Sequence, residues 1–124
     1  MNKPCLLAYA RTTFVHSQIE TVAEAQKLDA YFATQGEQLS QLVKTMAPFM
    51  MLLDLSGQDS GWMFRHISTV KSMKSDFPIV GLVANDEEAM RERAERYGCN
   101  AVLTKKELPK KLTKVVQAAL EKRL

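Results

Sequence analysis

Phe49-Met50-Met51-Leu52-Leu53-Asp54-Leu55 is a run in which every residue except Asp54 is apolar. A strand with apolar side chains on both faces is typical of the centre of a parallel sheet that helices cover on both sides. Pro48 precedes the run and ends any helix before it, and Ser56-Gly57 begins a loop after it. The run therefore predicts a buried central strand that carries one charged side chain near its carboxyl end.

Short apolar runs and helical periodicities alternate along the rest of the chain. We expect further strands at 4–10, 28–34, 78–84 and 101–104. Apolar residues recur at helical spacing in the segments 13–27, 39–46, 63–70 and 86–97, and again from Pro109 onward. Thr12 or Thr13 is expected to cap the first helix and Asn85 or Asp86 the fourth. Gly98 is expected to close the fourth helix in the left-handed conformation.

The alternation of strand and helix predicts an α/β fold. We expect an open, doubly wound parallel sheet of five strands in the flavodoxin-like order 2-1-3-4-5, with five helices on its two faces and a single domain over residues 1–124. In such sheets the functional crevice lies at the carboxyl ends of the strands, where the winding reverses. The residues expected at that crevice are Ala10, Arg11, Asp54, Ala84, Asn85 and Lys105.

Composition limits the class of protein. With 46% hydrophobic and 25% charged residues, the chain has the composition of a globular domain rather than a disordered or fibrous one. Its apolar runs are far shorter than the roughly 18 residues that span a bilayer, so we expect a cytoplasmic protein without membrane contact. Cys5 and Cys99 lack metal-ligand spacing and are expected to be reduced, structural thiols. The net charge of +3 comes largely from the carboxyl-terminal lysines, but no nucleic-acid-binding motif accompanies them, so we expect no nucleic acid partner.

Several stretches together resemble the receiver domain of bacterial two-component response regulators, the CheY-like family. They are Leu52-Leu53-Asp54-Leu55, Asp59-Ser60-Gly61-Trp62, Pro78-Ile79-Val80 and the stretch from Gly98 to Lys105. Ala10 and Asp54 are 54 − 10 = 44 positions apart, and Asp54 and Lys105 are 105 − 54 = 51 apart. The resemblance covers essentially the whole chain and implies a stand-alone signalling domain of phosphorelay type rather than an enzyme.

The resemblance also implies roles for individual residues. Asp54 matches the phosphoacceptor and Lys105 the phosphate-binding lysine. Val83 and Ala84 stand where the family has a phosphate-contacting hydroxyl and the switch residue beside it. The family holds Mg²⁺ with acidic residues at the end of the first strand, and the metal and the cations offset the repulsion between an attacking carboxylate and an anionic phosphoryl donor.

This chain departs from the family at most of those positions. Tyr9, Ala10 and Arg11 replace the acidic pocket, and no Asp or Glu precedes Glu20. Val102 replaces the aromatic switch residue. We therefore expect no cofactor and no metal, and expect Asp54 to be held permanently by Lys105 and Arg11. The alternative is a working phosphoacceptor in which Asp54, Asp59 or Asp86 gives Mg²⁺ partial ligation.

The resemblance implies that the output is contact with a signalling protein. The partner is expected to be a histidine kinase, a phosphotransfer protein, another regulator, or a second copy of the chain. The expected contact face is formed by the fourth helix, the fifth strand and the fifth helix, and its residues are Arg91, Glu95, Val102, Lys106 and Lys110. A flavodoxin-like enzyme or nucleotide binder remains as a different class, but it needs a glycine-rich loop after the first strand, and Arg11-Thr12-Thr13-Phe14 is not one.

Overall fold

Strands and helices alternate along the computed structural model, which describes residues 3–35, 37–57 and 60–123. The strands within these residues are β1 (Cys5–Tyr9), β2 (Asp29–Phe32), β3 (Met50–Asp54), β4 (Ile79–Val83) and β5 (Ala101–Thr104). The helices within them are α1 (Thr13–Gln26), α2 (Leu39–Met46), α3 (Gly61–Met73), α4 (Glu88–Tyr97) and α5 (Leu108–Arg123). The strands form one parallel sheet in the order β2-β1-β3-β4-β5, which confirms the predicted fold and strand order.

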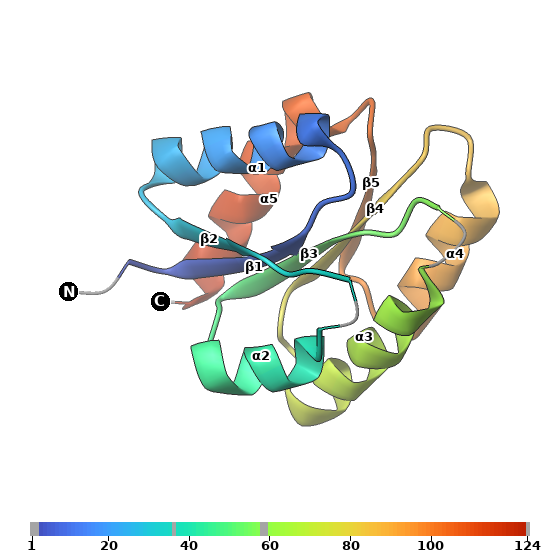
Figure 1. Ribbon diagram of the computed structural model, residues 1–124, viewed down its shortest axis with the longest axis horizontal. Helices are drawn as coiled ribbons and strands as arrows, with labels where there is room; N and C mark the ends of the chain where they lie inside the picture. Colours follow the sequence, from blue (N-terminus) through green and yellow to red (C-terminus); the bar gives the residue numbers. More distant parts are fainter. Residues whose placement is uncertain (1–2, 36, 58–59, 124) are drawn as a thin grey trace.

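Helices cover both faces of the sheet. Figure 1 shows α1 and α5 on one face and α2, α3 and α4 on the other. Every residue of β3 and β4 is buried, as the apolar run at 49–55 predicts for a central strand. The core consequently has two layers: one packs Leu52 and its neighbours against Ile19 of α1, and the other packs Leu53 and its neighbours against Ile67 of α3.

The register of the sheet brings the carboxyl ends of its central strands to one edge. Tyr9 pairs with Leu53, Asp54 pairs with Leu82, and Val83 pairs with Thr104. The loops that follow these strands therefore meet at the same end of the sheet, which lies on the right in Figure 1. The two chain termini lie at the opposite end.

Most helix ends follow local sequence signals, but the start of α4 does not. Thr12 caps α1, because its hydroxyl oxygen accepts a hydrogen bond from the Val15 N–H at 3.3 Å. Asn85 and Asp86 do not cap α4, which begins only at Glu88. The Asn85 side chain instead accepts a hydrogen bond from the backbone N–H of Lys106 at 2.9 Å. The predicted cap is therefore wrong, because a tertiary contact takes the side chain away from the helix.

Gly98 ends α4 with a positive φ of 126° and a ψ of 8°. The positive φ explains the glycine, but the residue lies outside the left-handed helical region that the sequence predicted. The predicted strand at 28–34 is also longer than the observed β2, which covers only Asp29–Phe32. β2 is an edge strand, and only one of its sides is held by a neighbour.

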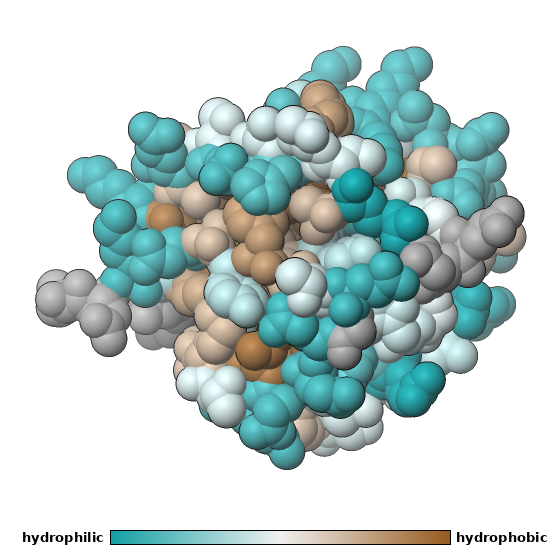
Figure 2. Space-filling view, viewed as in Figure 1, coloured by the Kyte–Doolittle hydropathy of each residue, from teal (hydrophilic) through white to brown (hydrophobic). Residues whose placement is uncertain are grey.

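The surface over β2 is mixed. Figure 2 shows hydrophilic residues around the rim of this face and apolar residues between the helices at its centre. Tyr31 of β2 lies on the surface, with 39% of the residue exposed. None of the helices that the structure describes is long and apolar enough to cross a membrane.

Both cysteines are free, as the sequence predicts. Cys99 is buried behind β4, and burial raises the pKa of its thiol to about 12. Cys5 is partly buried, and burial again raises the pKa of the thiol. Both groups therefore remain thiols at neutral pH and act as small apolar packing residues.

His66 of α3 supports the first turn of α2, a contact that the sequence does not reveal. Its Nδ1 atom accepts a hydrogen bond from the Ser40 backbone N–H at 3.3 Å and lies 3.1 Å from the Ser40 hydroxyl. Gln38 precedes α2 without capping it, so His66 supplies an acceptor that the local chain does not. This acceptor role requires a neutral ring with its proton on Nε2.

Stability is expected to fall as the pH is lowered from about 7 to about 5 because His66 becomes charged. Burial, followed by the charge of Arg65, lowers the pKa of His66 below its usual value in the folded protein. Its contribution is therefore complete above the unfolded-state pKa and is lost as the pH falls through the folded-state pKa. Unfolding by urea across this range measures the effect. The variant His66→Phe should show a flatter profile and be about 1 kcal/mol less stable at neutral pH. An identical slope in both proteins would exclude His66 as the cause.

Candidate functional site

Asp54 ends β3 with a side chain that is completely buried yet hydrogen-bonded on both oxygens. Its Oδ1 accepts the Ser56 hydroxyl at 2.6 Å and the Ser56 backbone N–H at 3.2 Å. Its Oδ2 accepts the backbone N–H of Arg11 at 3.2 Å. The chain itself therefore supplies the hydrogen bonds that a buried carboxylate needs.

Lys105, which follows β5, reaches Asp54 from the other side of β4. Its Nζ lies 3.8 Å from Oδ2 of Asp54, which is an ion pair but too long for a hydrogen bond. The Lys105 backbone N–H bonds to the carbonyl oxygen of Val83 at 3.1 Å, and this bond holds the start of the loop after β5 against β4. The structure thus brings together the two charged residues that the sequence placed at one site.

Arg11 belongs to the site, but in a different way from the one predicted. Its link to Asp54 is the backbone N–H. The guanidinium lies against Gly57 in the loop after β3, where a Cβ added to the glycine would be 2.9 Å from Arg11 Cζ. Gly57 has a φ of 104° and lacks a side chain, and both features leave room for this contact. The expected pairing of the Arg11 side chain with Asp54 is therefore replaced by a contact over the neighbouring loop.

The remaining positions of the acidic pocket carry no metal ligands. Tyr9 is buried, and its ring meets that of Trp62 edge-on with centroids 5.3 Å apart. Ala10 is half-buried and offers no side-chain oxygen. Over residues 3–35, 37–57 and 60–123, no group of three His, Cys, Asp or Glu side chains is gathered as a metal site. Because Mg²⁺ needs several clustered oxygen ligands, the described donor set does not fit this ion.

The alternative of partial Mg²⁺ ligation involves Asp59 and Asp86 in addition to Asp54. Asp59 lies outside the described residues. Asp86 is exposed in the loop between β4 and α4. In the same loop the Glu87 carboxylate accepts the backbone N–H of Ala84 at 3.1 Å, so its Oε1 already has a partner.

The position of the phosphate-contacting hydroxyl is apolar. Val83 is buried at the end of β4, and Ala84 after it offers only its backbone. The hydroxyl that does reach Asp54 belongs to Ser56, which the sequence reasoning did not single out. A serine two residues after an aspartate is a recognised local pattern, in which short polar side chains bond to nearby groups, and it could have indicated this contact.

A second polar cluster joins α4 to β5 and the start of α5. Nη1 of Arg91 donates to the carbonyl oxygen of Val102 at 2.8 Å, and Nη2 lies 3.2 Å from Oε1 of Glu107. Glu107 also accepts the Thr104 backbone N–H at 2.9 Å and pairs with Lys111 at 2.7 Å. The Lys111 ammonium, followed by the Thr104 N–H, lowers the pKa of Glu107 to about 2. The Glu107 carboxylate therefore stays ionised at neutral pH.

The predicted partner face is only partly available to a partner. Glu95, Lys106 and Lys110 are exposed. Arg91 is partly buried in the cluster just described, and the Val102 side chain is 6% exposed and packs in the core. The Val102 side chain therefore points towards α4 and α3 and contributes little to the exposed surface of this face.

Replacing Arg91 with methionine is expected to lower the free energy of unfolding by about 1.5 kcal/mol, because two hydrogen bonds from a charged group are lost. Glu107 would also lose one partner of its carboxylate. Thermal and urea unfolding measure the change. Arg96→Met is the matched control, since Arg96 is exposed in the last turn of the same helix and its replacement should cost less than about 0.5 kcal/mol. Equal losses in the two variants would mean that the Arg91 contacts do not stabilise the fold.

The fold of this chain resembles that of several solved structures. No family model and no curated protein matches the sequence. Solved structures do match. A CheY-like protein (tadZ) from Pseudomonas aeruginosa is similar with a TM-score of 0.77 and 13% identity over 94% of this chain and 98% of that one. A response regulator receiver domain protein from Clostridium thermocellum is similar with a TM-score of 0.77 and 14% identity, over 97% of this chain and 96% of that one.

A response regulator protein from Burkholderia multivorans gives a TM-score of 0.74 and 20% identity over 94% of both chains. In each case the likeness extends over almost the whole of both chains. The chain has the fold of CheY-like receiver domains of response regulators. At these identities the likeness establishes the fold, and the function has to be argued from the site.

Proposed function

We propose that this chain is a stand-alone receiver-like signalling domain of a two-component type system, one that acts by protein contact without Mg²⁺-dependent phosphorylation. In this proposal it is cytoplasmic and not an enzyme, and its partner is a histidine kinase, a phosphotransfer protein, another regulator or a second copy. The observation that carries the proposal is the hydrogen-bonding state of the Asp54 carboxylate. Both of its oxygens are already hydrogen-bonded by Ser56 and by the backbone of Arg11.

A carboxylate in this state is a poor nucleophile for a phosphoryl group. Oδ1 would have to give up its bond to the Ser56 hydroxyl, at 2.6 Å the shortest of the set, before it could attack, and Oδ2 already accepts the Arg11 N–H beside the Lys105 ammonium. No clustered carboxylates among the described residues draw in a metal that would offset the repulsion between Asp54 and an anionic phosphoryl donor. Both effects raise the barrier to transfer.

The second polar cluster, in which Arg91 contacts Val102 and Glu107, supports the same proposal, because it lies on the expected partner face. In a phosphorylation switch the face formed by α4, β5 and α5 has to change between two arrangements. Here Arg91 ties α4 to the backbone of Val102 and to Glu107, and Asn85 ties the loop before α4 to Lys106. We infer that the partner meets one preformed face, whose exposed charges of both signs favour weak and salt-sensitive association.

Phosphodonor labelling tests the proposal. The wild-type protein is incubated with acetyl phosphate and Mg²⁺, and its intact mass is measured. The expected result is no phosphorylated species in either the wild type or Asp54→Asn. A phosphorylated wild-type protein that needs Mg²⁺, with no labelling of Asp54→Asn, would contradict the proposal.

One observation favours the alternative, a phosphoacceptor at Asp54. The Nζ atom of Lys105 lies 3.8 Å from Oδ2 of Asp54. Lys105 therefore has the position from which the lysine of receiver domains contacts a phosphoryl oxygen. If the alternative holds, the labelling experiment gives a phosphorylated protein, and Lys105→Met reduces its yield. The same experiment therefore separates the two functions.

A further inference from the structure

Two adjoining hollows lie at the amino-terminal ends of the strands, at the end of the sheet opposite Asp54. The first has a volume of about 250 Å³ and the second of about 220 Å³. They share Pro78, Ala119 and Lys122 in their walls, so Lys122 of α5 stands at their junction. The proposed signalling function uses neither hollow.

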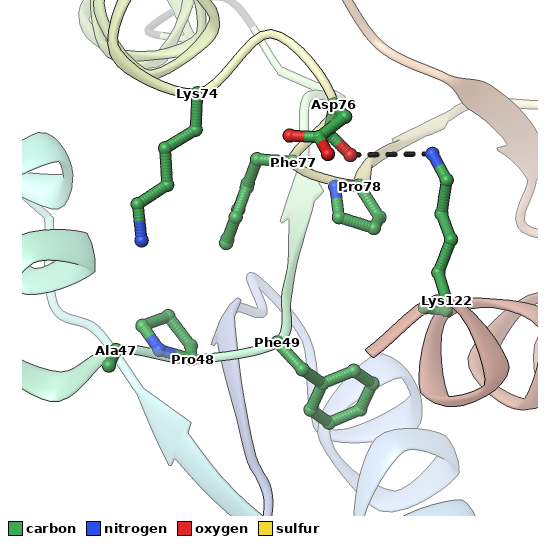
Figure 3. A pocket seen from close by; sticks show the side chains of 9 residues that line it. Ala47, Pro48, Phe49, Lys74, Asp76, Phe77, Pro78 and Lys122 are labelled. Atoms are coloured by element: carbon green, nitrogen blue, oxygen red, sulfur yellow. Dashed lines mark hydrogen bonds between the residues drawn. The ribbon is translucent and has the colours of Figure 1, made fainter. Parts of the chain in front are cut away.

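The first hollow combines apolar walls with two lysines. Figure 3 shows Lys74, at the end of α3, and Lys122 approaching it from opposite sides, with Phe49 and Phe77 between them. The Lys122 ammonium donates to the backbone oxygen of Asp76 at 3.4 Å. Asp76 also lines the hollow, so two basic residues and one acidic residue are among its described lining residues and positive charge prevails.

A third lysine, Lys71 of α3, lies close to the first hollow and adds to its positive charge. The Nζ of Lys71 donates to the carbonyl oxygen of Phe77 and to the side chain of Asn100, both at 2.6 Å. Burial and then the charge of Lys122 lower the pKa of Lys71, while the charge of Asp76 acts in the opposite sense. Lys71 and Lys122 are thus close enough to repel each other, and an anion placed beside Lys122 would relieve that repulsion.

The second hollow is a groove between α5 and the β4–β5 side of the sheet. Its walls are mostly small apolar side chains, which are Pro78, Val80, Ala101, Val115, Ala118 and Ala119. Asn100 and Lys122 are its polar lining residues. Ala118 is exposed and Ala101 is half-buried, so short side chains leave the groove open along the helix. An apolar chain lying there would be covered on both sides.

The charge and the shape of the two hollows are complementary to one kind of molecule. We propose that they bind a free medium-chain alkyl carboxylate, with its carboxylate between Lys74 and Lys122 and its alkyl chain in the groove beside α5. The anionic head meets the excess of ammonium groups, and the tail removes apolar surface of the groove from water. A compact inorganic anion would leave the groove empty, and a neutral lipid would leave the lysines without a counter-charge.

Calorimetric titration of the full chain with butanoate, hexanoate and octanoate, below the concentrations at which they form micelles, tests the proposal. Affinity is expected to rise about threefold for each added methylene group. The neutral alcohol 1-octanol should bind at least tenfold more weakly than octanoate. An affinity that does not depend on chain length, or equal binding of octanol and octanoate, would overturn the proposal.

Matched variants locate the site. Lys122→Gln should weaken octanoate binding about tenfold, whereas Lys114→Gln, which removes the same charge from an exposed position of the same helix, should leave it within about twofold. Asp76→Asn should strengthen binding, because it removes the negative charge of the acidic residue among the described lining of the first hollow. Equal effects of Lys122→Gln and Lys114→Gln would overturn the proposal.

Ala118→Leu tests the groove separately. Leucine is a good helix former and the position is exposed, so the variant should fold. Its larger side chain should fill the groove and lower the affinity for octanoate, with little change for butanoate. Unchanged octanoate binding in Ala118→Leu, or binding to phosphatidylglycerol vesicles but not to octanoate, would overturn the proposal. These outcomes are independent of phosphodonor labelling, so this inference and the proposed function can fail separately.

Discussion

Replacing Lys105 with methionine is expected to lower the free energy of unfolding by about 2 kcal/mol. Removing one partner of a buried ion pair usually costs about 3–5 kcal/mol, because the other charge is left without compensation. The expected loss is smaller here because 28% of the Lys105 side chain is exposed and Ser56 still donates to Asp54. Urea unfolding followed by circular dichroism measures it.

Lys106→Met is the control for this prediction. Lys106 is the next residue along the chain and is exposed, so its replacement should change stability by less than about 0.5 kcal/mol. Adding Asp54→Asn to Lys105→Met should recover about 1 kcal/mol, since the uncompensated charge is then removed. If Lys105→Met and Lys106→Met are equally stable, Lys105 does not neutralise Asp54.

The largest loss, about 3 kcal/mol, is expected for Gly81→Val in the centre of β4. A Cβ added to Gly81 would lie 2.9 Å from Cδ1 of Leu55, 3.2 Å from Sγ of Cys99 and 3.7 Å from Cβ of Ala94. Valine adds two methyl groups beyond that Cβ, in a core where every residue of the strand is buried. Either the strand or its neighbours have to move, and close-packed interiors resist such movement.

Two further substitutions test the steric cause. Gly81→Ala should lie between the wild type and Gly81→Val, because it adds only the Cβ. Gly61→Ala, at the first residue of α3, should raise the free energy of unfolding by about 0.5 kcal/mol, because among the described residues no atom beyond its chain neighbours and its own helix backbone lies within 4 Å of the added Cβ. Urea unfolding of all three compares them. If Gly81→Val is as stable as the wild type, the neighbours of Gly81 do not exclude a larger side chain, and the steric explanation is wrong.

The fold was predictable from the sequence because each element carries its own periodicity. The apolar run around β3 and the helical spacing in α1, α2 and α5 placed these elements within a few residues of where they lie. The start of α4 was not predictable, because Asn85 is a good cap by type but bonds to Lys106, which is distant in sequence. A local pattern carries no information about such a partner.

The site was predictable in its charged residues and not in its hydrogen bonds. Asp54 and Lys105 had to meet, because the carboxyl ends of parallel strands lie at one edge of a sheet. The part played by Arg11 depended on the path of the loop around Gly57, which turned the side chain away and left the backbone N–H on Asp54. The pairing of Arg91 with Glu107 joins α4 to the turn before α5, and neither residue has a local signal for it.

Mg²⁺ affinity tests the central claim most directly, that the chain's own donors hold Asp54 and leave no place for a metal. The melting temperature is measured in EDTA and at about 10 mM Mg²⁺, with KCl at matched ionic strength as the control, since an ion that binds the folded state raises stability by RT ln(1 + [L]/Kd). We expect the Mg²⁺ and KCl samples to melt together, in the wild type and in Asp54→Asn alike. A saturable stabilisation by Mg²⁺ that KCl does not reproduce and that Asp54→Asn abolishes would contradict the account.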